Sequence, residues 1–466
     1  KIKKVRKKLR RSQSAVDAAK LSDMRLNLKH SIKKAKEYHF SVSMKNFLVS
    51  SPAKFWRQLS KKKKPVYSVV VDGELITDAT QTASSFNRFF CTVFTHDDGR
   101  KPHLNSACPP ITDVSVTEEG VFSLLLSCDA KKTPGIDDIP NTFLVRYAEW
   151  CSKYLTLIFK KSLLNAELPE DWKHGKIIPI PKTENSSLLS SYRPISLLCT
   201  SSKILEHILF GHISAFLETN HVIDDRQHGF RKGFSTVTQL LETMQDFAAA
   251  IDNQCQIDVI FLDFEKAFDR VSHRKFLLKL NTIFKNDLLL TWIQAYLSSR
   301  YQSISIGNAC SSPALVSSGI PQGSVLGPLF FLIFINDIVK EIPVKIKLFA
   351  DDCVLYHEIR TPADQLLLND ALAKIHDWCS TWQMSINTKK TVSMSITRKK
   401  RPLSFAYTIN NHPLSTVDSY KYLGLTISSD LRWNKYISNI KNKAMKKLGF
   451  LRRSLRYSTQ EIRLLA

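Results

Sequence analysis

Two segments of the sequence place carboxylates directly beside strand-like runs of apolar residues. In DVIFLDFEKAFDRV (258–271), the β-rich run 259–262 ends at Asp263. In KLFADDCVLY (347–356), apolar runs flank Asp351 and Asp352, so this pair is predicted at the tip of a hairpin. Carboxylates pressed together repel one another and normally need divalent cations, and two Mg²⁺ ions would support an in-line phosphoryl transfer. An Asp-Asp doublet is also ordinary turn chemistry, so alone it does not establish catalysis.

The elements around these segments alternate between helical and β-rich patterns. Helices are predicted over 118–126, 143–164, 203–218 and 237–251, and strands over 176–180, 257–263, 303–306, 345–349 and 354–356. This mixture predicts an α/β or α+β core with a predominantly antiparallel sheet. Residues 264–271 are predicted to turn toward helix, which would direct Asp269 away from Asp263 and out of any metal site.

The segments outside this core are predicted to be mainly helical. A basic amphipathic helix is predicted over 5–35, a small hairpin over 69–76 with an Asp-Gly turn, and a buried helix over 83–94. Residues 95–112 have the composition of a linker. Near the other end, residues 434–453 predict a second basic helix, with Tyr436, Ile440, Ala444, Leu448 and Leu451 on one face.

The net charge of +25 is concentrated at the two ends of the chain. Residues 1–64 carry 21 Lys and Arg against 3 acids, and residues 389–466 carry 17 against 3, whereas the centre is mildly acidic. Two basic flanks around an acidic centre are typical of a polyanion-binding protein, in which the flanks bind phosphates and the carboxylates of the centre hold cations. Solvated helical faces would give the same charge distribution.

Length and composition predict a globular protein of two to four packed units. The chain has 466 residues, of which 43% are hydrophobic and 23% charged. Its longest apolar run, 328–335, is too short to cross a bilayer. The nine cysteines are widely spaced, which favours neither a zinc site nor a disulfide framework and fits a reducing compartment. Because the sequence begins at Lys1 without Met or a signal peptide pattern, we interpret it as a fragment.

Nine motifs follow one another between residues 132 and 427. They are KTPGIDDIPNTFL (132–144), WKHGKIIPIPK (172–182), SYRPISLLCTSSKILEHIL (191–209), DDRQHGFRKGFSTVTQL (224–240), FLDFEKAFDRVSH (261–273), SGIPQGSVLGPLFFLIFINDI (318–338), FADD (349–352), INTKKT (386–391) and YKYLGLTI (420–427). In this order they resemble the reverse transcriptases, and most closely those of non-LTR (LINE-type) retrotransposons. The resemblance covers roughly residues 115 to 460.

The resemblance implies a right-hand polymerase fold with an antiparallel palm sheet. The expected parts are a basic helical N-terminal extension with its linker (1–112), fingers (113–255), a catalytic palm (256–425) and the start of a thumb (426–466). It implies an RNA-directed DNA polymerase that extends a DNA primer on an RNA template from dNTPs with two Mg²⁺ ions, for which Mn²⁺ is an alternative. It also implies an intracellular protein, active in the nucleus, without a membrane partner; the sequence indicates no oligomeric state.

The resemblance also implies a role for individual residues at the matching positions. The implied set is Asp263, Asp351 and Asp352 as metal-binding catalytic carboxylates; Lys390 (or its neighbour Lys389) as the acid that protonates pyrophosphate; Lys182 and Arg193 as triphosphate ligands; Phe268 as the gate that excludes a 2′-hydroxyl; Gln322 and Gly323 as nucleotide contacts; and Tyr422, Leu423 and Gly424 as the primer grip. From structure alone, Phe268 could equally be a core residue, Lys182 a surface lysine and 319–323 a glycine-rich helix entry.

Two other functions compete with the polymerase. A catalytically inactive, transposon-derived nucleic-acid-binding protein would keep the fold without the activity. An RNA-dependent RNA polymerase would share the palm, but viral enzymes of that class typically place Asp where Phe268 stands and Gly before the Asp doublet, where this chain has Ala350.

Overall fold

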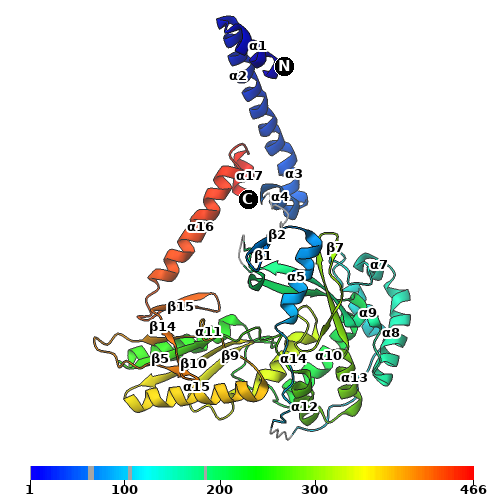
Figure 1. Ribbon diagram of the computed structural model, residues 1–466, viewed down its shortest axis with the longest axis vertical. Coiled ribbons are helices and arrows are strands. Elements are labelled where there is room, and N and C mark those ends of the chain that lie inside the picture. Colours follow the sequence, from blue (N-terminus) through cyan, green and yellow to red (C-terminus); the bar gives the residue numbers. More distant parts are fainter. Residues whose placement is uncertain (1, 61–67, 103–107, 183–185, 466) are drawn as a thin grey trace. The chain divides into compact units, whose positions relative to one another are not determined.

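The computed structural model describes residues 2–60, 68–102, 108–182 and 186–465 and divides into two compact units (Figure 1). One unit combines the two ends of the chain, Lys1–Val66 and Asn434–Ala466, and the other is Tyr67–Trp433. The boundaries expected for extension, fingers, palm and thumb stay predictions.

Helices make up the first unit. They are α1 (Ile2–Ser12), α2 (Ala15–Tyr38), a π-helical turn (His39–Met44), α3 (Lys45–Ser50), α4 (Pro52–Ser60), α16 (Asn434–Ser454) and α17 (Gln460–Leu465). The prediction of one helix over 5–35 is wrong, because Gln13 has a left-handed φ of 46° that ends α1. Ser14 then caps α2, since its hydroxyl accepts a hydrogen bond from the Val16 N–H.

The two ends of the chain share one small hydrophobic core. Met44 and Phe55 from the N-terminal part are buried with Leu455 and Ile462 from the C-terminal part. Lys45 Nζ lies 2.7 Å from Glu461 Oε2 at the edge of this cluster. Helix α16 buries none of its residues fully: on its predicted apolar face, Leu451 packs partly against this core, whereas Ile440 and Leu448 are exposed.

A five-stranded sheet forms the centre of the second unit. Its order is β14 (Ser415–Thr416), β11 (Val392–Ile396), β5 (Gln256–Leu262), β10 (Asp352–Ile359) and β9 (Lys345–Phe349). All neighbours are antiparallel except β11 and β14, which confirms the prediction of a predominantly antiparallel sheet. Every residue of β5 is buried, as expected for a central strand covered on both faces.

Alternation along β5 sends its side chains into two separate cores. Ile260 and Leu262 join the larger core, which lies against α12 (His273–Phe284), α14 (Leu326–Ile335) and α15 (Pro362–Trp382). Val259 and Phe261 join a second core with α11 (Thr236–Asp252) and the hairpin β15 (Ser419–Tyr422)–β16 (Leu425–Ser428). The sheet is therefore held between two hydrophobic layers.

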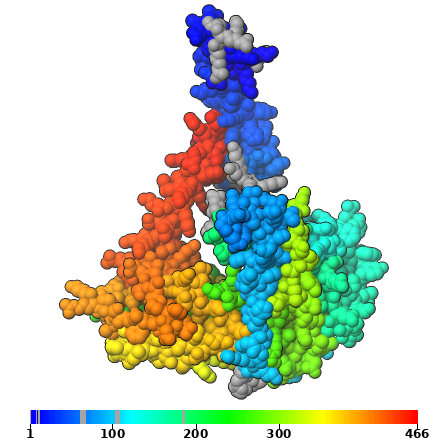
Figure 2. Space-filling model, viewed as in Figure 1, coloured from blue at the N-terminus to red at the C-terminus, as the bar shows by residue number. Residues whose placement is uncertain are grey.

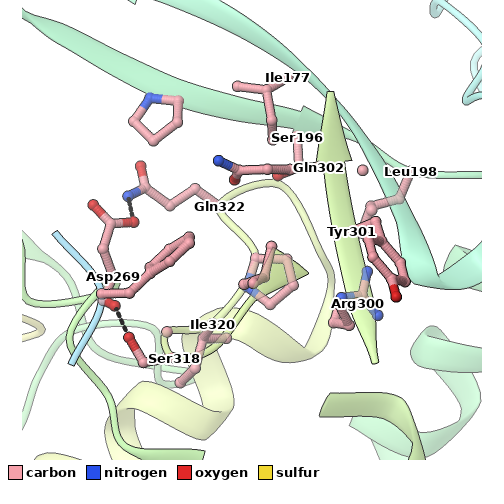
Figure 3. A pocket seen from close by; sticks show the side chains of 16 residues that line it. Ile177, Ser196, Leu198, Asp269, Arg300, Tyr301, Gln302, Ser318, Ile320 and Gln322 are labelled. Carbon is pink, nitrogen blue, oxygen red and sulfur yellow. Dashed lines mark hydrogen bonds between the residues drawn. The ribbon is translucent and has the colours of Figure 1, made fainter. Parts of the chain in front are cut away.

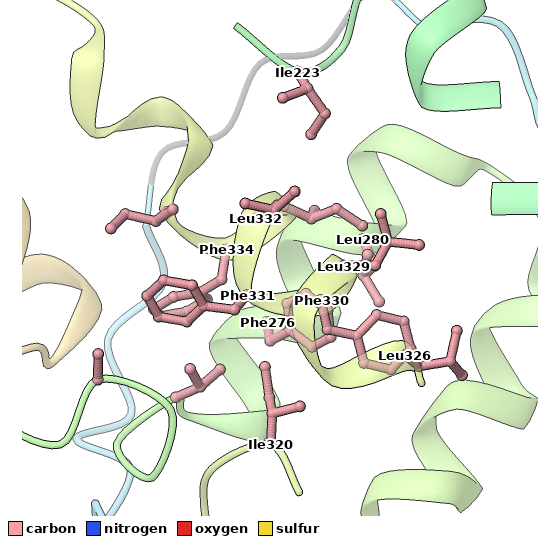
Figure 4. Packing of buried hydrophobic residues seen from close by; sticks show 14 of the residues in the cluster. Ile223, Phe276, Leu280, Ile320, Leu326, Leu329, Phe330, Phe331, Leu332 and Phe334 are labelled. Atoms are coloured by element: carbon pink, nitrogen blue, oxygen red, sulfur yellow. The ribbon is translucent and has the colours of Figure 1, made fainter. Parts of the chain in front are cut away.

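Helix α14 is the apolar centre of the larger core. Nine of its ten residues are buried, and Figure 4 shows Phe330, Phe331 and Phe334 packed beside Phe276 of α12. Burying each such ring stabilises the fold by roughly 1.5–3 kcal/mol relative to leaving it exposed. This buried helix fixes the loop that precedes it, residues 319–325.

A second sheet lies beside that loop. It consists of β4 (Tyr192–Leu197), β3 (His174–Pro181), β6 (Arg300–Ile306) and β7 (Ala309–Cys310), with β8 (Ala314–Val316) also paired to β6. Helix α5 (Ala79–Cys91) covers it, because Phe86 and Phe90 pack with Ile177 and Ile304. Figure 2 shows the light-blue segment that contains α5 beside a surface recess in which green residues are visible.

The remaining elements surround the two sheets. They are β1 (Val69–Val71), β2 (Glu74–Ile76), α6 (Glu118–Leu126), α7 (Asn141–Arg146), α8 (Ala148–Asn165), α9 (Glu170–Lys173), 3-10 turns at Leu189–Ser191 and Asn336–Val339, α10 (Thr200–Thr219), α13 (Asp287–Leu297), β12 (Thr408–Ile409) and β13 (His412–Pro413). The predicted hairpin and the helices near 118, 203 and 237 are confirmed. The single helix over 143–164 is wrong, because the backbone leaves helical geometry at Tyr147 and divides α7 from α8.

The expected helix over 264–271 is also wrong. This segment consists of turns, and α12 begins only at His273. Its backbone groups bond to distant segments instead: Glu265 N–H donates to the Ser385 carbonyl at 2.8 Å, and the Phe268 carbonyl accepts from Ile320 N–H at 2.8 Å. Local hydrogen bonds, such as that from the Arg270 N–H to the Lys266 carbonyl at 3.1 Å, close single turns, and the tertiary bonds satisfy other backbone groups of the segment.

Candidate active site

Three carboxylates lie at one end of the central sheet. β5 and β10 are antiparallel with Leu262 opposite Cys353, so Asp263, which follows β5, lies across from Asp352, which begins β10. Asp352 in turn pairs with Phe349 of β9, and Ala350 and Asp351 form the turn between them. The structure thus places the acidic doublet in the predicted hairpin turn.

The backbone of Asp263 is fixed by the loop that carries the INTKKT motif. Its N–H donates to Thr391 Oγ1 at 3.2 Å, and its carbonyl accepts from the Asn387 N–H at 2.7 Å. From the same loop, Lys390 Nζ lies 3.5 Å from Asp263 Oδ1. Thus the loop that orients the carboxylate also supplies its cationic neighbour.

The protonation of the acidic doublet reflects crowding by protein atoms and by like charge. Loss of hydration, followed by the charges of Asp351 and Asp263, raises the pKa of Asp352 to about 6. Loss of hydration also raises the pKa of Asp351, to which the Asp263 charge adds, while Arg193 opposes the shift. Like-charged carboxylates that raise one another's pKa are the donor set expected for hard divalent cations.

Among the described residues, no three His, Cys, Asp or Glu side chains already stand as a metal-binding cluster. Asp263, Asp351 and Asp352 nevertheless lie at the same end of the central sheet. Their oxygen donors fit Mg²⁺ chemically, and they are the residues that would hold it.

Three further basic side chains, Lys182, Arg193 and Lys266, lie near one another and near Lys390, beside this acidic group. Arg193 is on β4, opposite Ile180 of β3, and Lys182 follows that strand. Loss of hydration lowers the pKa of Lys182, and the positive charges of Lys266, Lys390 and Arg193 lower it further. The pKa of Lys266 is lowered for the same reasons, although the Asp269 carboxylate partly offsets the shift. Cations that repel one another in this way form a site prepared for a polyanion such as a phosphate chain.

Asp269 supports the neighbouring loop. Its Oδ1 accepts a hydrogen bond from Gln322 Nε2 at 2.8 Å, and burial raises its pKa. The sequence predicted a helix over 264–271 that would direct Asp269 away from Asp263. This reasoning was wrong, because the segment forms turns and not a helix. Figure 3 shows the Asp269 and Gln322 side chains joined at the edge of a pocket between the second sheet and the loop 318–322.

Gly323 allows this loop to contact β4 directly. It has a φ of 128°, and a Cβ placed there would lie 2.4 Å from the Ser196 carbonyl oxygen. The adjacent Gln322 carbonyl accepts from the Ser196 N–H at 2.7 Å. Close approach and backbone conformation therefore both require glycine at this position.

Phe268 is half-buried between these groups and the core. Its ring stacks on Phe331 of α14, with centroids 4.5 Å apart and an interplanar angle of 20°. This contact gives the ring a fixed orientation. The observed packing agrees both with a core residue and with a rigid wall beside a bound sugar.

The residues of the expected primer grip occupy the hairpin β15–β16 over the opposite core. Leu423 and Gly424, with φ of 45° and 91°, form its two-residue turn. Tyr422 is buried instead, and its hydroxyl accepts a hydrogen bond from Gln239 Nε2 at 2.9 Å. Of these three residues, Gly424 is exposed, Leu423 is half-buried and Tyr422 is buried.

Comparison with known proteins decides the family. Residues 180–427 match the family described as reverse transcriptase (RNA-dependent DNA polymerase). The chain belongs to this family. The resemblance to non-LTR reverse transcriptases is thereby confirmed, because the matching relatives include proteins of such elements.

Three relatives show the extent of the match. A probable RNA-directed DNA polymerase from transposon BS of Drosophila melanogaster is 27% identical over 490 residues, 99% of this chain and 54% of the relative. The RNA-directed DNA polymerase from mobile element jockey of the same species is 30% identical over 336 residues, 70% of this chain and 36% of the relative. A retrovirus-related Pol polyprotein from type-1 retrotransposable element R1 of Bradysia coprophila is 25% identical, with 85% and 40% covered. The chain thus spans about half the length of the first of these relatives and less of the other two.

The reverse transcriptase chain brings most of the expected site residues into two groups. The acids and Lys390 meet at the central sheet, while Lys182, Arg193, Gln322 and Gly323 approach from the second sheet and its loop. Lys266 is the residue that our sequence analysis missed. It lies three residues after Asp263 in the FEKAF segment. The helix predicted for residues 264–271 gave no reason to expect its side chain near Lys182. In the described part of the chain, we find no helix with the length and apolar character needed to span a membrane.

Proposed function

We propose that this chain is the catalytic polymerase of a non-LTR retrotransposon, which extends a DNA 3′-hydroxyl on an RNA template from dNTPs. The observation that carries the proposal is the arrangement of three carboxylates at one sheet end, with Lys390 beside them and Lys182, Arg193 and Lys266 near a glycine loop. This arrangement matches a substrate that has a metal-binding end and a phosphate chain. In this proposal, the chain would extend its DNA primer in the nucleus.

In this proposal the residues divide the work by charge. Asp263, Asp351 and Asp352 would hold the divalent ions, and the basic set Lys182, Arg193, Lys266 and Lys390 would hold the triphosphate. Two bound Mg²⁺ ions would activate the attacking hydroxyl and stabilise the leaving pyrophosphate. Lys390, already beside Asp263, would donate a proton to the leaving group. In the terms of the right-hand fold, β3 and β4 would belong to the fingers, the central sheet to the palm and α16 to the thumb.

Primer extension tests the proposal directly. The protein is incubated with poly-rA, a 5′-labelled oligo-dT, dTTP and Mg²⁺, and the products are resolved on a gel. Extension that requires Mg²⁺ and the RNA template supports it. Template binding without extension would support the inactive alternative, which the intact acidic set does not favour.

Sugar selection provides a second test, at Phe268. In Phe268→Ala, loss of the ring beside Phe331 should open space for a 2′-hydroxyl. The preference for dTTP over rUTP, measured as a ratio of kcat/KM, should fall by about 10-fold or more. Phe143→Ala on the exposed face of α7 should leave the ratio unchanged. An unchanged ratio in the Phe268 variant would make this ring a core residue only.

The basic helix α16 provides a test of template-primer binding. Lys441, Lys443, Lys446 and Lys447 are all exposed. Each phosphate that a cation neutralises contributes roughly −0.7 to −0.9 to the slope of log K against log salt. Replacing all four lysines by Gln should therefore flatten the slope by about 2 to 3 units and weaken binding to all sequences alike. Fluorescence anisotropy across a salt series measures it, and an unchanged slope would remove α16 from the binding surface.

A further inference from the structure

The turn that carries the acidic doublet depends on a residue in an unfavourable conformation. Ala350 has a φ of 55°, a left-handed geometry that costs a residue with a Cβ about 1–2 kcal/mol. The ladder between β9 and β10 ends at the pair Phe349 and Asp352, so it leaves the Ala350 N–H without a strand partner. That N–H instead donates to Gln227 Oε1 at 3.0 Å.

Gln227 is completely buried and its amide orientation is fixed by two donors. The same Oε1 that bonds Ala350 also accepts from the Gly229 N–H at 2.7 Å. The other end of the amide, Nε2, is buried without a hydrogen-bond partner among the described residues. An unsatisfied buried donor costs about 1–3 kcal/mol, which a side chain serving only to fill space would avoid.

The backbone on either side of Gln227 also forms hydrogen bonds with the hairpin β9–β10, which carries the acidic doublet. The His228 N–H donates to the Leu348 carbonyl and the Leu348 N–H donates to the Arg226 carbonyl, both at 2.9 Å. Next to them, a Cβ on Gly229 would lie 2.3 Å from the Ala350 nitrogen. Residues 226–229, which we name the Gln227 clamp, therefore contact the turn through main chain and side chain.

Ion pairs and hydrogen bonds attach the clamp to two helices. The Arg231 guanidinium lies 2.8 Å from Glu218 of α10 and donates to the Gln227 carbonyl at 3.2 Å. His228 Nδ1 lies 3.0 Å from Thr238 Oγ1 in the first turn of α11. The clamp thus connects the turn to the helical scaffold and not only to its own sheet.

We propose that Gln227 is a positioning residue that holds the Ala350 turn and thereby places Asp351 and Asp352 for catalysis. It touches neither substrate nor metal in this role. The proposal rests on the proposed function of the acidic doublet and adds the device that orients it.

The test replaces Gln227 by Met, which has similar volume but no strong acceptor. Hydrogen exchange of the peptide that covers residues 347–353 should show the Ala350 amide exchanging about tenfold faster. In primer extension with Mg²⁺, kcat should fall by about 10- to 100-fold while KM for dTTP and template-primer affinity change by less than about twofold. The exchange measurement needs no activity, so it separates failure of the clamp from failure of the proposed function.

Two further variants make the result specific. Gln227→Glu keeps the acceptor oxygens and should restore slow exchange and most of kcat. Gln365→Met removes another buried glutamine, one that bonds Asp258 at 3.2 Å, and should leave the Ala350 exchange and kcat unchanged even if the melting temperature falls. Unchanged exchange in Gln227→Met, or equal loss of kcat in the Glu and Met variants, would overturn the proposal.

Discussion

Asp352→Asn should reduce primer extension by at least about 10³-fold, because a neutral amide can no longer supply the anionic oxygen that a two-metal site requires. Asp351→Asn should have the same effect. Affinity for the template-primer should stay within a few-fold of the unmodified protein, since the basic residues that grip phosphate are unchanged. Single-turnover extension and anisotropy measure the two quantities separately.

Stability distinguishes this loss from unfolding. The folded-state pKa of Asp352, about 6, is above the usual unfolded value near 3.9, so the folded state binds more protons between these pH values. Its ionisation therefore opposes folding above pH 6, and stability should rise as the pH falls through 6. At pH 8 the Asn variant should melt at the same temperature or higher. Asp370→Asn on α15, an exposed acid paired with Lys374, should keep full activity. Near-normal extension by Asp352→Asn would contradict the metal assignment.

The second large effect is expected at Gly323. A methyl group there must move the Ser196 carbonyl and also adopt a φ of 128°, so the loop should shift away from β4. Because a displacement of about 1 Å in a reacting group can cost 10²-fold in rate, Gly323→Ala should lower kcat/KM for dTTP by about 10²-fold.

A matched control separates the close contact from the backbone conformation. Gly307, in the turn between β6 and β7, also has a positive φ, of 61°, but nothing lies within 4 Å of the position of its Cβ. Gly307→Ala should therefore retain kcat/KM within about twofold, apart from a small loss of stability. Equal kinetics for the two variants would mean that the contact between Gly323 and β4 does not shape the nucleotide site.

The sequence predicted those parts of the site whose position depends on local pattern. Short β-rich runs of apolar residues located β5, β9 and β10, and the acidic doublet between two such runs located the turn. Residues 264–271 escaped prediction because their local pattern resembles a helix, whereas hydrogen bonds to the Ser385 carbonyl and from the Ile320 N–H favour turns. Lys266 was missed for that reason. Contacts between segments far apart in sequence leave no periodic signal, so the interaction of Gln227 with Ala350 could not be inferred either.

The small core shared by the two ends imposes an order on biosynthesis. Lys45 and Glu461 are separated by 416 residues, and a ribosome adds about 5–20 residues per second. Roughly 20–80 s therefore pass between synthesis of the first half of this core and synthesis of its second half. During that time the apolar side chains of Met44 and Phe55 emerge without the partners that later bury them. We expect Tyr67–Trp433 to fold during translation, whereas the terminal helices complete their packing only afterwards and depend on chaperones in the interval.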